Sequence, residues 1–395
     1  MKISLIQPSR NNLKYLKWSY NSIRKNQGDH EVEICVADDA STDDTWKWCL
    51  EMMDKDSHFK AIQNNTGERI GHTILYDRLI NEVATNDIAM IYHADMYLCP
   101  NALTAIEKYI KPRSIVSLTR IEPPLHPKGP EKILWHGGVE PEEFKEQGLL
   151  DKLTEFTNVD KTTGGIFAPW AFYKKDFQEI GGHDPLYAPQ SKEDSDIFNR
   201  FQLNGINFIQ TWEGFVYHMT CRGSRRNTLD KAKNIYEDSP EWLAQNQRSS
   251  RNFVRKWGHF VKHDPLLIPI IPPKYDIGFI VKNCNSQLLE LLEPWCSNIL
   301  IDDEMQVLTS HYVDKEQKNT LFKLDERIKS TPFESLNNEI IVTIDRNTLT
   351  QQDFQIIQQL SEIIKDSGEI GEFQLGNLFI SIIQMNEYQN NLIKL

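Results

Sequence analysis

Short apolar segments alternate with longer amphipathic segments through the first hundred residues of the chain. The apolar segments lie at residues 2–8, 30–39, 59–65 and 87–96. Their length and pattern are typical of strands, whereas the segments between them repeat apolar residues at helical spacing. Such strand–helix repeats predict an α/β fold with a mostly parallel sheet and helices on both faces. Ligands bind these sheets beyond the carboxyl ends of the strands, so Pro8–Arg10, Asp38–Asp39 and His93–Asp95 should meet in one crevice.

A proline-rich segment divides the chain. With 395 residues the chain exceeds one ordinary domain, and residues 263–273 (HDPLLIPIIPP) have the composition of a stiff linker. The strand–helix pattern restarts after this linker. We therefore expect a first domain at 1–262, with halves at about 1–111 and 112–230 and a helical tail to 262, and a smaller α/β domain at 274–395.

Charge, apolar runs and cysteine spacing argue against nucleic-acid binding, a membrane span and secretion. A net charge of −12 disfavours nucleic-acid binding, because an acidic protein repels phosphate backbones. No apolar run approaches the roughly 20 residues that span a bilayer, and the first residues read as a strand instead of a signal peptide. The six cysteines are scattered and form no CxxC pair. These features predict a reduced, cytoplasmic protein.

Two polar strings follow predicted strands. VADDASTDDT at 36–45 either caps the next helix through Asp39, Ser41 or Asp43, or uses a carboxylate at the strand end, Asp38 or Asp39, to accept a hydrogen bond from a nucleobase or ribose. HAD at 93–95 follows an apolar strand. A carboxylate and an imidazole two positions apart on an extended chain point the same way, so His93 and Asp95 could share a divalent ion.

The order strand–Pro, strand–DDxS, strand–DxD resembles the GT-A glycosyltransferases of family 2. The resemblance covers about residues 1–225 and implies an inverting transfer of a sugar from a nucleotide-sugar donor. It also implies a divalent cofactor, Mn²⁺ or Mg²⁺, held by Asp95. The chain departs from the family because His93 replaces the first acid of the DxD motif, which leaves the strictness of metal dependence open. His218, after the last core strand, fits the family position that completes the metal shell.

A third constellation lies at 179–201. In the family, a GG-aromatic-D segment approaches the sugars, and an ED pair at a helix start supplies the catalytic base. The resemblance therefore makes Asp194 the base, because the acceptor hydroxyl must lose a proton as it attacks. Asp196 is the rival for this role, and the structural alternative for Asp194 is a helix N-terminal charge favoured by the dipole.

The remaining site residues are predicted with the help of the resemblance. An arginine cluster at 222–226 either is a solvated loop or forms a lid that neutralises the leaving diphosphate. The expected nucleotide and donor contacts are Pro8, Ser9, Arg10, Asp38, Asp39, Arg69, Arg78, His93, Ala94, Arg222 and Arg225. The expected acceptor and sugar contacts are Gly164, Gly165, Trp170, Gly182, His183, Asp184 and Glu193. The expected metal ligands are Asp95, His218 and His93.

These predictions favour a glycosyltransferase that uses a UDP- or GDP-sugar and a glycan or glycoconjugate acceptor. One alternative is a non-catalytic carbohydrate-binding or assembly protein on a degenerate fold, which the histidine at position 93 keeps open. The other is a sugar nucleotidyltransferase, which needs a glycine-rich basic loop after the first strand, where this chain has QPSRNN. The smaller domain could bind acceptor, form a homo-oligomer or be a degenerate second transferase module.

Overall fold

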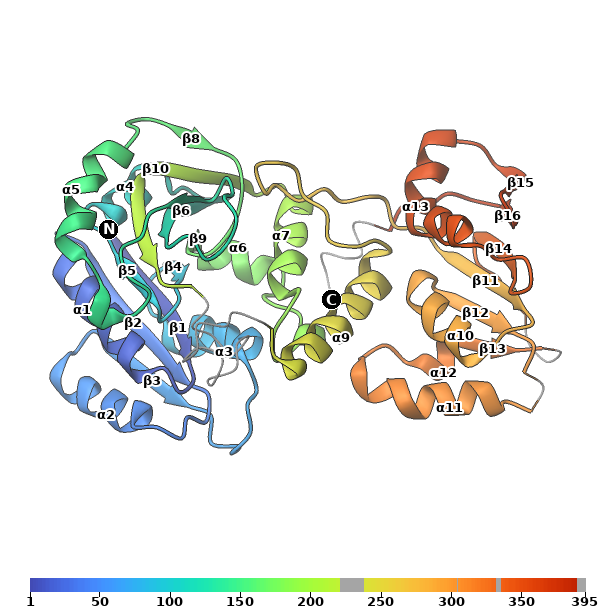
Figure 1. Ribbon diagram of the computed structural model, residues 1–395, viewed down its shortest axis with the longest axis horizontal. Coiled ribbons are helices and arrows are strands. Elements are labelled where there is room, and N and C mark those ends of the chain that lie inside the picture. The colour runs from blue at the N-terminus through green and yellow to red at the C-terminus, as the bar shows by residue number, and fades with distance from the viewer. Residues whose placement is uncertain (221–237, 304, 332–334, 389–395) are drawn as a thin grey trace. The chain divides into compact units, whose positions relative to one another are not determined.

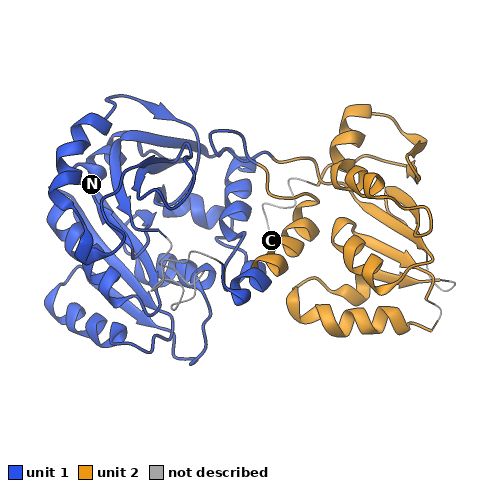
Figure 2. Ribbon diagram, in the orientation of Figure 1, with its two compact units in different colours: residues 1–245, 263–270 blue, residues 246–262, 271–395 orange. Residues whose placement is uncertain are grey.

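The computed structural model describes residues 1–220, 238–303, 305–331 and 335–388. The chain forms two compact units (Figure 2). Unit 1 comprises residues 1–245 and 263–270, and unit 2 comprises residues 246–262 and 271–395. Each unit is built around one sheet with flanking helices (Figure 1), so the predicted α/β class with a second, smaller α/β part is confirmed.

The first half of unit 1 is a run of parallel strands. These are β1 (Lys2–Ser9), β2 (Glu31–Asp38), β3 (Phe59–Gln63) and β4 (Ile88–Ile91). β1 lies between β2 and β4, and β3 pairs with β2 on its other side. Ser9 is paired with Asp38 in the register of β1 and β2. The polar residues that follow these strands therefore leave the sheet at the same edge.

The second half of unit 1 extends this sheet with mixed pairing. Its strands are β5 (Met96–Leu98), β6 (Ser114–Glu122), β7 (Lys132–Leu134), β8 (Thr162–Thr163), β9 (Trp170–Tyr173) and β10 (Asn207–His218). The main strand order is β3-β2-β1-β4-β9-β6-β10-β5. Residues 206–219 look like a strand pair in sequence, but they form the single strand β10. Its register with β6 shifts between Thr211 and Phe215, because a bulge interrupts the ladder there.

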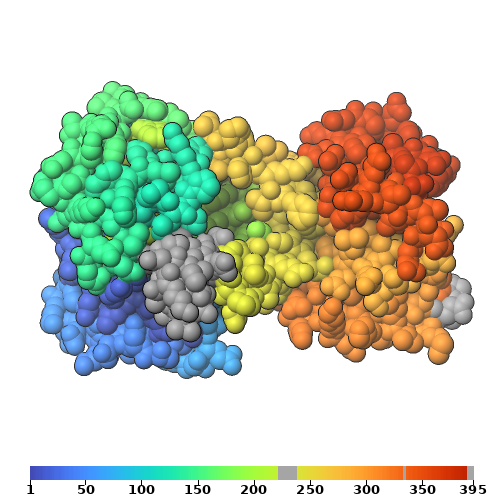
Figure 3. All heavy atoms as spheres, viewed as in Figure 1, coloured from blue at the N-terminus to red at the C-terminus, as the bar shows by residue number. Residues whose placement is uncertain are grey.

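Helices flank the sheet of unit 1. They are α1 (Leu13–Asn26), α2 (Thr45–Lys55), α3 (His72–Arg78), α4 (Ala102–Tyr109), α5 (Glu146–Phe156), α6 (Lys174–Glu179) and α7 (Glu193–Leu203). Short helical turns are η1 (Leu79–Val83), η2 (Pro141–Glu143) and η3 (Pro185–Tyr187). In the space-filling view the blue N-terminal residues adjoin the teal and green residues of the second half (Figure 3).

Unit 2 has a sheet of its own, in the order β13-β12-β11-β14-β16-β15. The strands are β11 (Ile277–Lys282), β12 (Asn298–Ile301), β13 (Ile328–Ser330), β14 (Ile340–Asp345), β15 (Gly371–Leu375) and β16 (Leu378–Ile382). Its helical elements are α10 (Ser286–Leu292), η4 (Glu293–Trp295), α11 (Val307–Glu316), η5 (Gln317–Asn319), α12 (Leu324–Arg327) and α13 (Gln351–Ser367). A Thr350–Asp353 capping box begins α13, and Gly368 ends it in the left-handed conformation.

The boundary between the units falls inside α9 (Pro240–Trp257) and not at the proline-rich segment. We expected the helical tail to 262 to belong to the first domain, but residues 246–262 join unit 2. The reason is a buried ion network, in which Arg255 binds Glu293 at 2.7 Å and Glu316 at 2.6 Å. Part of the expected linker, residues 263–270, joins unit 1 instead.

The structure also bears on the predictions about membrane-spanning segments and cysteines. Among the residues that the structure describes, no helix has both the length and the apolar character that a membrane crossing requires. The cysteines in the described ranges are all free thiols: Cys35, Cys49, Cys99, Cys284 and Cys296.

Candidate active site

The ends of β1, β2 and β4 open into a cavity of about 540 Å³ in unit 1. Many of the predicted site residues line it: Pro8, Ser9, Arg10, Asp39, Arg69, His93, Ala94, Asp95, Glu193, Asp194 and His218. They come from segments up to 210 positions apart in the sequence, which the strand order brings to one edge of the sheet. The predicted crevice is therefore present.

Asp38 and Asp39 differ in their surroundings. The Asp39 carboxylate accepts hydrogen bonds from Asn64 Nδ2 (2.8 Å), from the backbone N–H of Ile70 (3.0 Å) and from that of Gly71 (2.9 Å). It thus fixes the loop that carries Arg69 into the cavity wall. Asp38 is fully buried, accepts a hydrogen bond from the Ser41 N–H, and does not line the cavity. Its position indicates a structural role.

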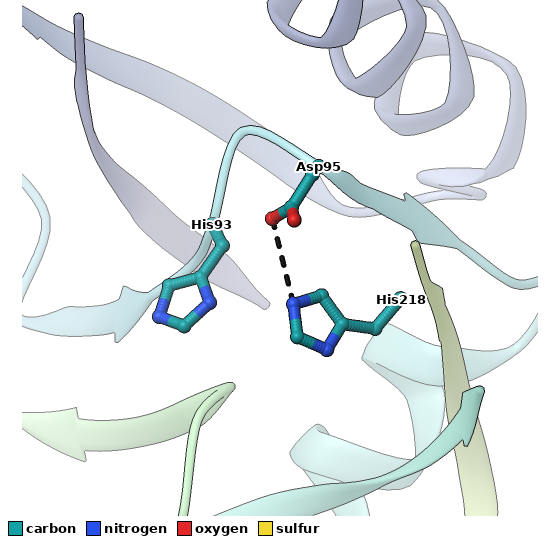
Figure 4. Close-up of side chains that lie close together, drawn as sticks. All are labelled: His93, Asp95 and His218. Carbon is teal, nitrogen blue, oxygen red and sulfur yellow. Dashed lines mark ion pairs between the residues drawn. The ribbon is translucent and has the colours of Figure 1, made fainter. Parts of the chain in front are cut away.

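Three potential metal ligands lie together at the cavity wall (Figure 4). His93 and Asp95 follow β4, and His218 ends β10. Their ligand atoms lie within 4.8 Å of one another, and His218 Nε2 is 3.5 Å from Asp95 Oδ1. Donor atoms on opposite sides of one ion are about 4.5 Å apart, given metal–ligand distances near 2.0–2.3 Å. Two imidazoles and one carboxylate therefore fit a divalent transition-metal ion.

The protonation of this cluster follows from its burial and its charges. Burial works against ionisation of Asp95, but His218 outweighs it and lowers the pKa of Asp95 to about 2. Burial, followed by repulsion from His218, lowers the pKa of His93 to about 3, so its imidazole is neutral. Burial opposes protonation of His218, yet Asp95 and Glu122 raise its pKa to about 9. At neutral pH Asp95 is therefore anionic, His93 is neutral, and His218 carries a proton that a bound metal ion would displace.

Glu122, at the end of β6, supports this cluster from behind. Its Oε1 is 2.8 Å from His218 Nδ1, and the residue is almost fully buried. Arg120 and Lys132 each approach the Glu122 carboxylate to 3.1 Å, and Glu131 lies 3.2 Å and 3.3 Å from the same two cations. A carboxylate on Nδ1 directs Nε2 of the histidine toward the cavity, which is how metal-binding histidines are usually oriented.

Glu193 and Asp194 begin α7 and face the same cavity. Glu193 Oε1 is 2.6 Å from His72 Nε2. Burial opposes ionisation of Glu193, but the charge of His72 outweighs it and lowers the Glu193 pKa. Burial and the negative charge of Glu193 raise the pKa of Asp194 to about 6. The two adjacent carboxyl groups therefore have pKa values shifted in opposite directions, an arrangement common at catalytic sites.

His183 and Gly182 lie behind the cavity wall. The His183 ring is buried, its Nδ1 is 2.6 Å from Asp77 Oδ1, and it stacks on Tyr76, which lines the cavity. Gly182 has a φ of +71°, and a Cβ there would lie 2.2 Å from Asp77 Oδ2. Only glycine allows this carboxylate to reach the His183 backbone and ring. These residues hold Tyr76 in place and do not line the cavity.

Several predicted sugar contacts lie elsewhere. Trp170 was expected as a stacking platform, but it is fully buried among Phe172, Phe198 and Phe201, so this interpretation is corrected to a core role. A Cβ on Gly165 would lie 2.1 Å from the Leu266 carbonyl oxygen, so this glycine allows a close approach of unit 1's own backbone.

Other predicted residues also lie outside the cavity lining. Gly164 packs in the same way as Gly165, against the side chain of Ile268. Asp184 caps η3, where it accepts a hydrogen bond from the Leu186 N–H. Arg78 pairs with Glu82 at the surface. Asp196, the rival base, is fully buried and bonded to Arg200 at 2.8 Å. The predicted phosphate contacts Arg222 and Arg225, with Arg226, lie outside the described residues.

Further lining residues were not predicted from the sequence. They are Asn12, His72, Tyr76, His126, Gln190, Ser191, Lys192, Ser195, Thr220 and Trp242. A local signal existed for Lys192 and Ser195, which flank the ED pair, and for Asn12, which follows the first strand. His72 had no such signal, because the preceding Gly71 serves chain packing: a Cβ there would lie 2.0 Å from the Pro189 carbonyl oxygen. Glu122 had no signal, because its partner His218 is 96 positions away.

Comparison with known proteins adds a family match. Residues 4–181 match the model of glycosyl transferase family 2. This segment contains the strands β1 to β9, with the HAD string, and ends in the GG turn. No curated protein sequence matches the chain.

Solved structures similar to the chain are distant. GalNAc-T7, solved with UDP, GalNAc and Mn²⁺, has 15% identity and a TM-score of 0.42 over 55% of this chain and 44% of its own. TarS 1–349 of S. aureus has 16% identity and a TM-score of 0.40 over 65% and 74%. The mannosyltransferase PcManGT of Pyrobaculum calidifontis, solved with GDP-Man and Mn²⁺, has 15% identity and a TM-score of 0.40 over 64% and 69%. The chain thus spans less than half the length of GalNAc-T7.

Proposed function

We propose that this protein transfers a sugar, with inversion, from a UDP- or GDP-sugar to a hydroxyl of a carbohydrate or glycoconjugate, a function supported by the match of residues 4–181 to the model of glycosyl transferase family 2. One observation carries the proposal. Asp194, a carboxyl group with a raised pKa, lines the same cavity as the cluster of His93, Asp95 and His218. A donor and an acceptor bound in this cavity would thus have a proton acceptor, Asp194, and a cation site for the leaving diphosphate.

The donor half of the site combines a cation site with fixed positive charge. Asp95, His93 and His218 would hold Mn²⁺ or Mg²⁺, which neutralises charge on a leaving diphosphate when bound. Arg10 and Arg69 line the same cavity, and guanidinium groups suit phosphate oxygens. Asp39 holds the Arg69 loop through its backbone contacts. These residues would bind and orient the nucleotide at the ends of β1 and β2.

The acceptor half depends on Asp194. In an inverting transfer the acceptor oxygen attacks the anomeric carbon as the bond to the diphosphate breaks, and the hydroxyl proton passes to a base. A carboxylate with a pKa near 6 is ionised at neutral pH and still basic enough to accept that proton. Glu193 is held by His72, so it remains a fixed negative charge beside Asp194. Glu193 is therefore a positioning residue.

A second candidate is a carbohydrate-binding protein without transfer activity. The observation that favours it is His93, an imidazole where the family motif has an acid. The two functions differ in whether the nucleotide-sugar is cleaved. A binding protein would bind a nucleotide or a glycan, but it would produce no free nucleotide from a nucleotide-sugar over time.

The experiment is a screen of UDP- and GDP-sugars for nucleotide release with Mn²⁺, first into water and then with a panel of methyl glycosides. We expect one donor to be hydrolysed slowly and transferred faster once an acceptor is present. Asp194→Asn should lose transfer by about 10²–10⁴-fold and still bind UDP. Asp44→Asn, at an exposed position outside the cavity, is the matched control. Full transfer activity in Asp194→Asn would contradict the assignment of Asp194 as the base. If the wild type released nucleotide from no donor, the proposed transferase activity would be wrong.

A further inference from the structure

Trp242 has a position that its sequence context does not suggest. Among the residues that the structure describes, it is the one tryptophan in the cavity wall. Trp170, Trp257, Trp48 and Trp295 are buried in cores, and the Trp212 ring lies under Lys161. Trp242 is half-buried and borders the same space as Asp194. Trp242 therefore forms part of the wall of the proposed active site.

The first turns of α9 hold Trp242 at the cavity wall. The backbone N–H of Trp242 donates to Ser239 Oγ at 3.2 Å. Gln245, three positions later and on the same helix face, donates from Nε2 to the Gln190 carbonyl oxygen at 3.0 Å. Gln190 also accepts a hydrogen bond from Arg69 Nη2 at 2.6 Å through its side chain. This face of α9 is thus tied to the loop that leads into Glu193 and Asp194.

The residues next to Trp242 on α9 are exposed. Leu243, the next residue, is 51% exposed, and Glu241 and Ala244 are exposed as well. None of these three lines the cavity. The contrast with Trp242 identifies one face of α9 as part of the site and supplies a neighbouring position for a control.

The two sides of the cavity have different chemistry. Pro8, Ser9, Arg10 and Asp39 lie at the ends of β1 and β2, where parallel sheets bind nucleotides. Residues 190–195 form a second wall of the cavity, and α9, which carries Trp242, is hydrogen-bonded to that segment through Gln245 and Gln190. The acceptor hydroxyl must lie within hydrogen-bond reach of Asp194, so the rest of the acceptor meets this second wall.

We propose that Trp242 is the platform for the acceptor, and that the acceptor is a pyranoside. A pyranose has one face of C–H groups, and covering that apolar face with an indole removes it from water. Tryptophan offers a large contact area and loses little side-chain entropy on binding, because it has only two side-chain torsions. Stacking would hold the ring so that one hydroxyl faces Asp194. This inference rests on the proposed function and names the substrate class of its acceptor side.

The test compares Trp242→Ala, Trp242→Phe and Leu243→Ala in the full chain. Three quantities are measured: UDP affinity with Mn²⁺, donor hydrolysis without acceptor, and KM for the methyl pyranoside that the wild type uses best. Trp242→Ala should raise the acceptor KM about tenfold or more and leave UDP affinity and donor hydrolysis within about twofold. Trp242→Phe should keep most of the acceptor affinity, because a phenyl ring also stacks. Leu243→Ala should match the wild type in all three measurements.

Two results would overturn the inference. An unchanged acceptor KM in Trp242→Ala shows that the indole does not bind the acceptor. An equal loss of UDP affinity shows that it stacks on the nucleobase. Failure of the proposed function is distinguishable from both, because the wild type would then hydrolyse no donor at all.

Discussion

Glu122 provides a sharp test of the metal site, because it lies behind the ligands and does not line the cavity. Its Oε1 is 2.8 Å from His218 Nδ1. Replacing it with glutamine removes the negative charge but keeps an oxygen that accepts the same hydrogen bond. Replacing it with alanine removes the hydrogen bond altogether. The two variants separate the effect of the charge from that of orientation.

The expected magnitudes follow from the type of hydrogen bond. A bond to a charged group contributes roughly 1.5–3 kcal/mol, and a neutral one contributes roughly half as much. Glu122→Gln should therefore weaken Mn²⁺ binding about tenfold, and Glu122→Ala about a hundredfold, since 1.4 kcal/mol corresponds to roughly a factor of ten. Partners of metal-binding histidines typically contribute about 10–100-fold in affinity, which is the same range.

The assay is a titration of free Mn²⁺ by electron paramagnetic resonance in the presence of saturating UDP, with thermal unfolding recorded alongside. Glu131→Gln is the matched control, because Glu131 contacts Arg120 and Lys132 as Glu122 does, while it is Glu122 that contacts His218. The reasoning is refuted if Glu122→Ala binds Mn²⁺ as tightly as the wild type. It is also refuted if the Glu131 variant loses as much affinity, because the ion network and not His218 would then be responsible.

Two further predictions concern pH and unit 2. Asp194 acts as a base only when ionised, so kcat/KM should rise about tenfold per pH unit below its pKa of about 6 and level off above it. A rise of kcat/KM that already levels off near pH 4 would contradict the raised pKa of Asp194. In unit 2, Glu293→Gln removes one of the two charge partners of the buried Arg255 and leaves Glu316 in place, so it should destabilise that unit by roughly 1.5–3 kcal/mol in urea denaturation. Glu290→Gln, in an exposed pair with Lys315, should cost less than about 1 kcal/mol, and an equal loss in both variants would contradict the reasoning.

The nucleotide side of the site was predictable because its signals are local. Each of the strands β1, β2 and β4 is an apolar run that ends in polar residues, so Arg10, Asp39 and Asp95 could be placed at one sheet edge from the chain alone. The same reasoning could not separate Asp38 from Asp39. Both follow the strand, and only the three-dimensional path of residues 64–71 shows which carboxylate fixes the loop at the cavity.

The acceptor side was less predictable because its residues meet through distant contacts. Glu122 and His218 are 96 positions apart, and Gln190 and Gln245 are 55 apart. Trp170 illustrates the converse error. It follows a glycine pair, as a binding loop would, but it begins β9, which pairs with β4 on one side and β6 on the other and is covered by α7. A tryptophan in a central strand is core, and its sequence neighbours do not reveal that the strand is central.

The histidine at position 93 changes the charge balance of the site. The acidic residues lining the described cavity are Asp39, Asp95, Glu193 and Asp194, and the lysine and arginine residues are Arg10, Arg69 and Lys192. An aspartate at 93 would add a negative charge where the diphosphate is expected, worth roughly 2 kcal/mol at about 8 Å and an effective dielectric constant near 20. We therefore expect His93→Asp to weaken UDP binding in EDTA about thirtyfold. The same variant should respond more strongly to Mg²⁺, because Mg²⁺ prefers carboxylate to imidazole, whereas the wild type should prefer Mn²⁺. Calorimetric titration of UDP in EDTA, Mg²⁺ and Mn²⁺ measures all three affinities for both proteins. Equal UDP affinities of the two proteins in EDTA, Mg²⁺ and Mn²⁺ would show that the imidazole takes no part in binding either the ion or the diphosphate.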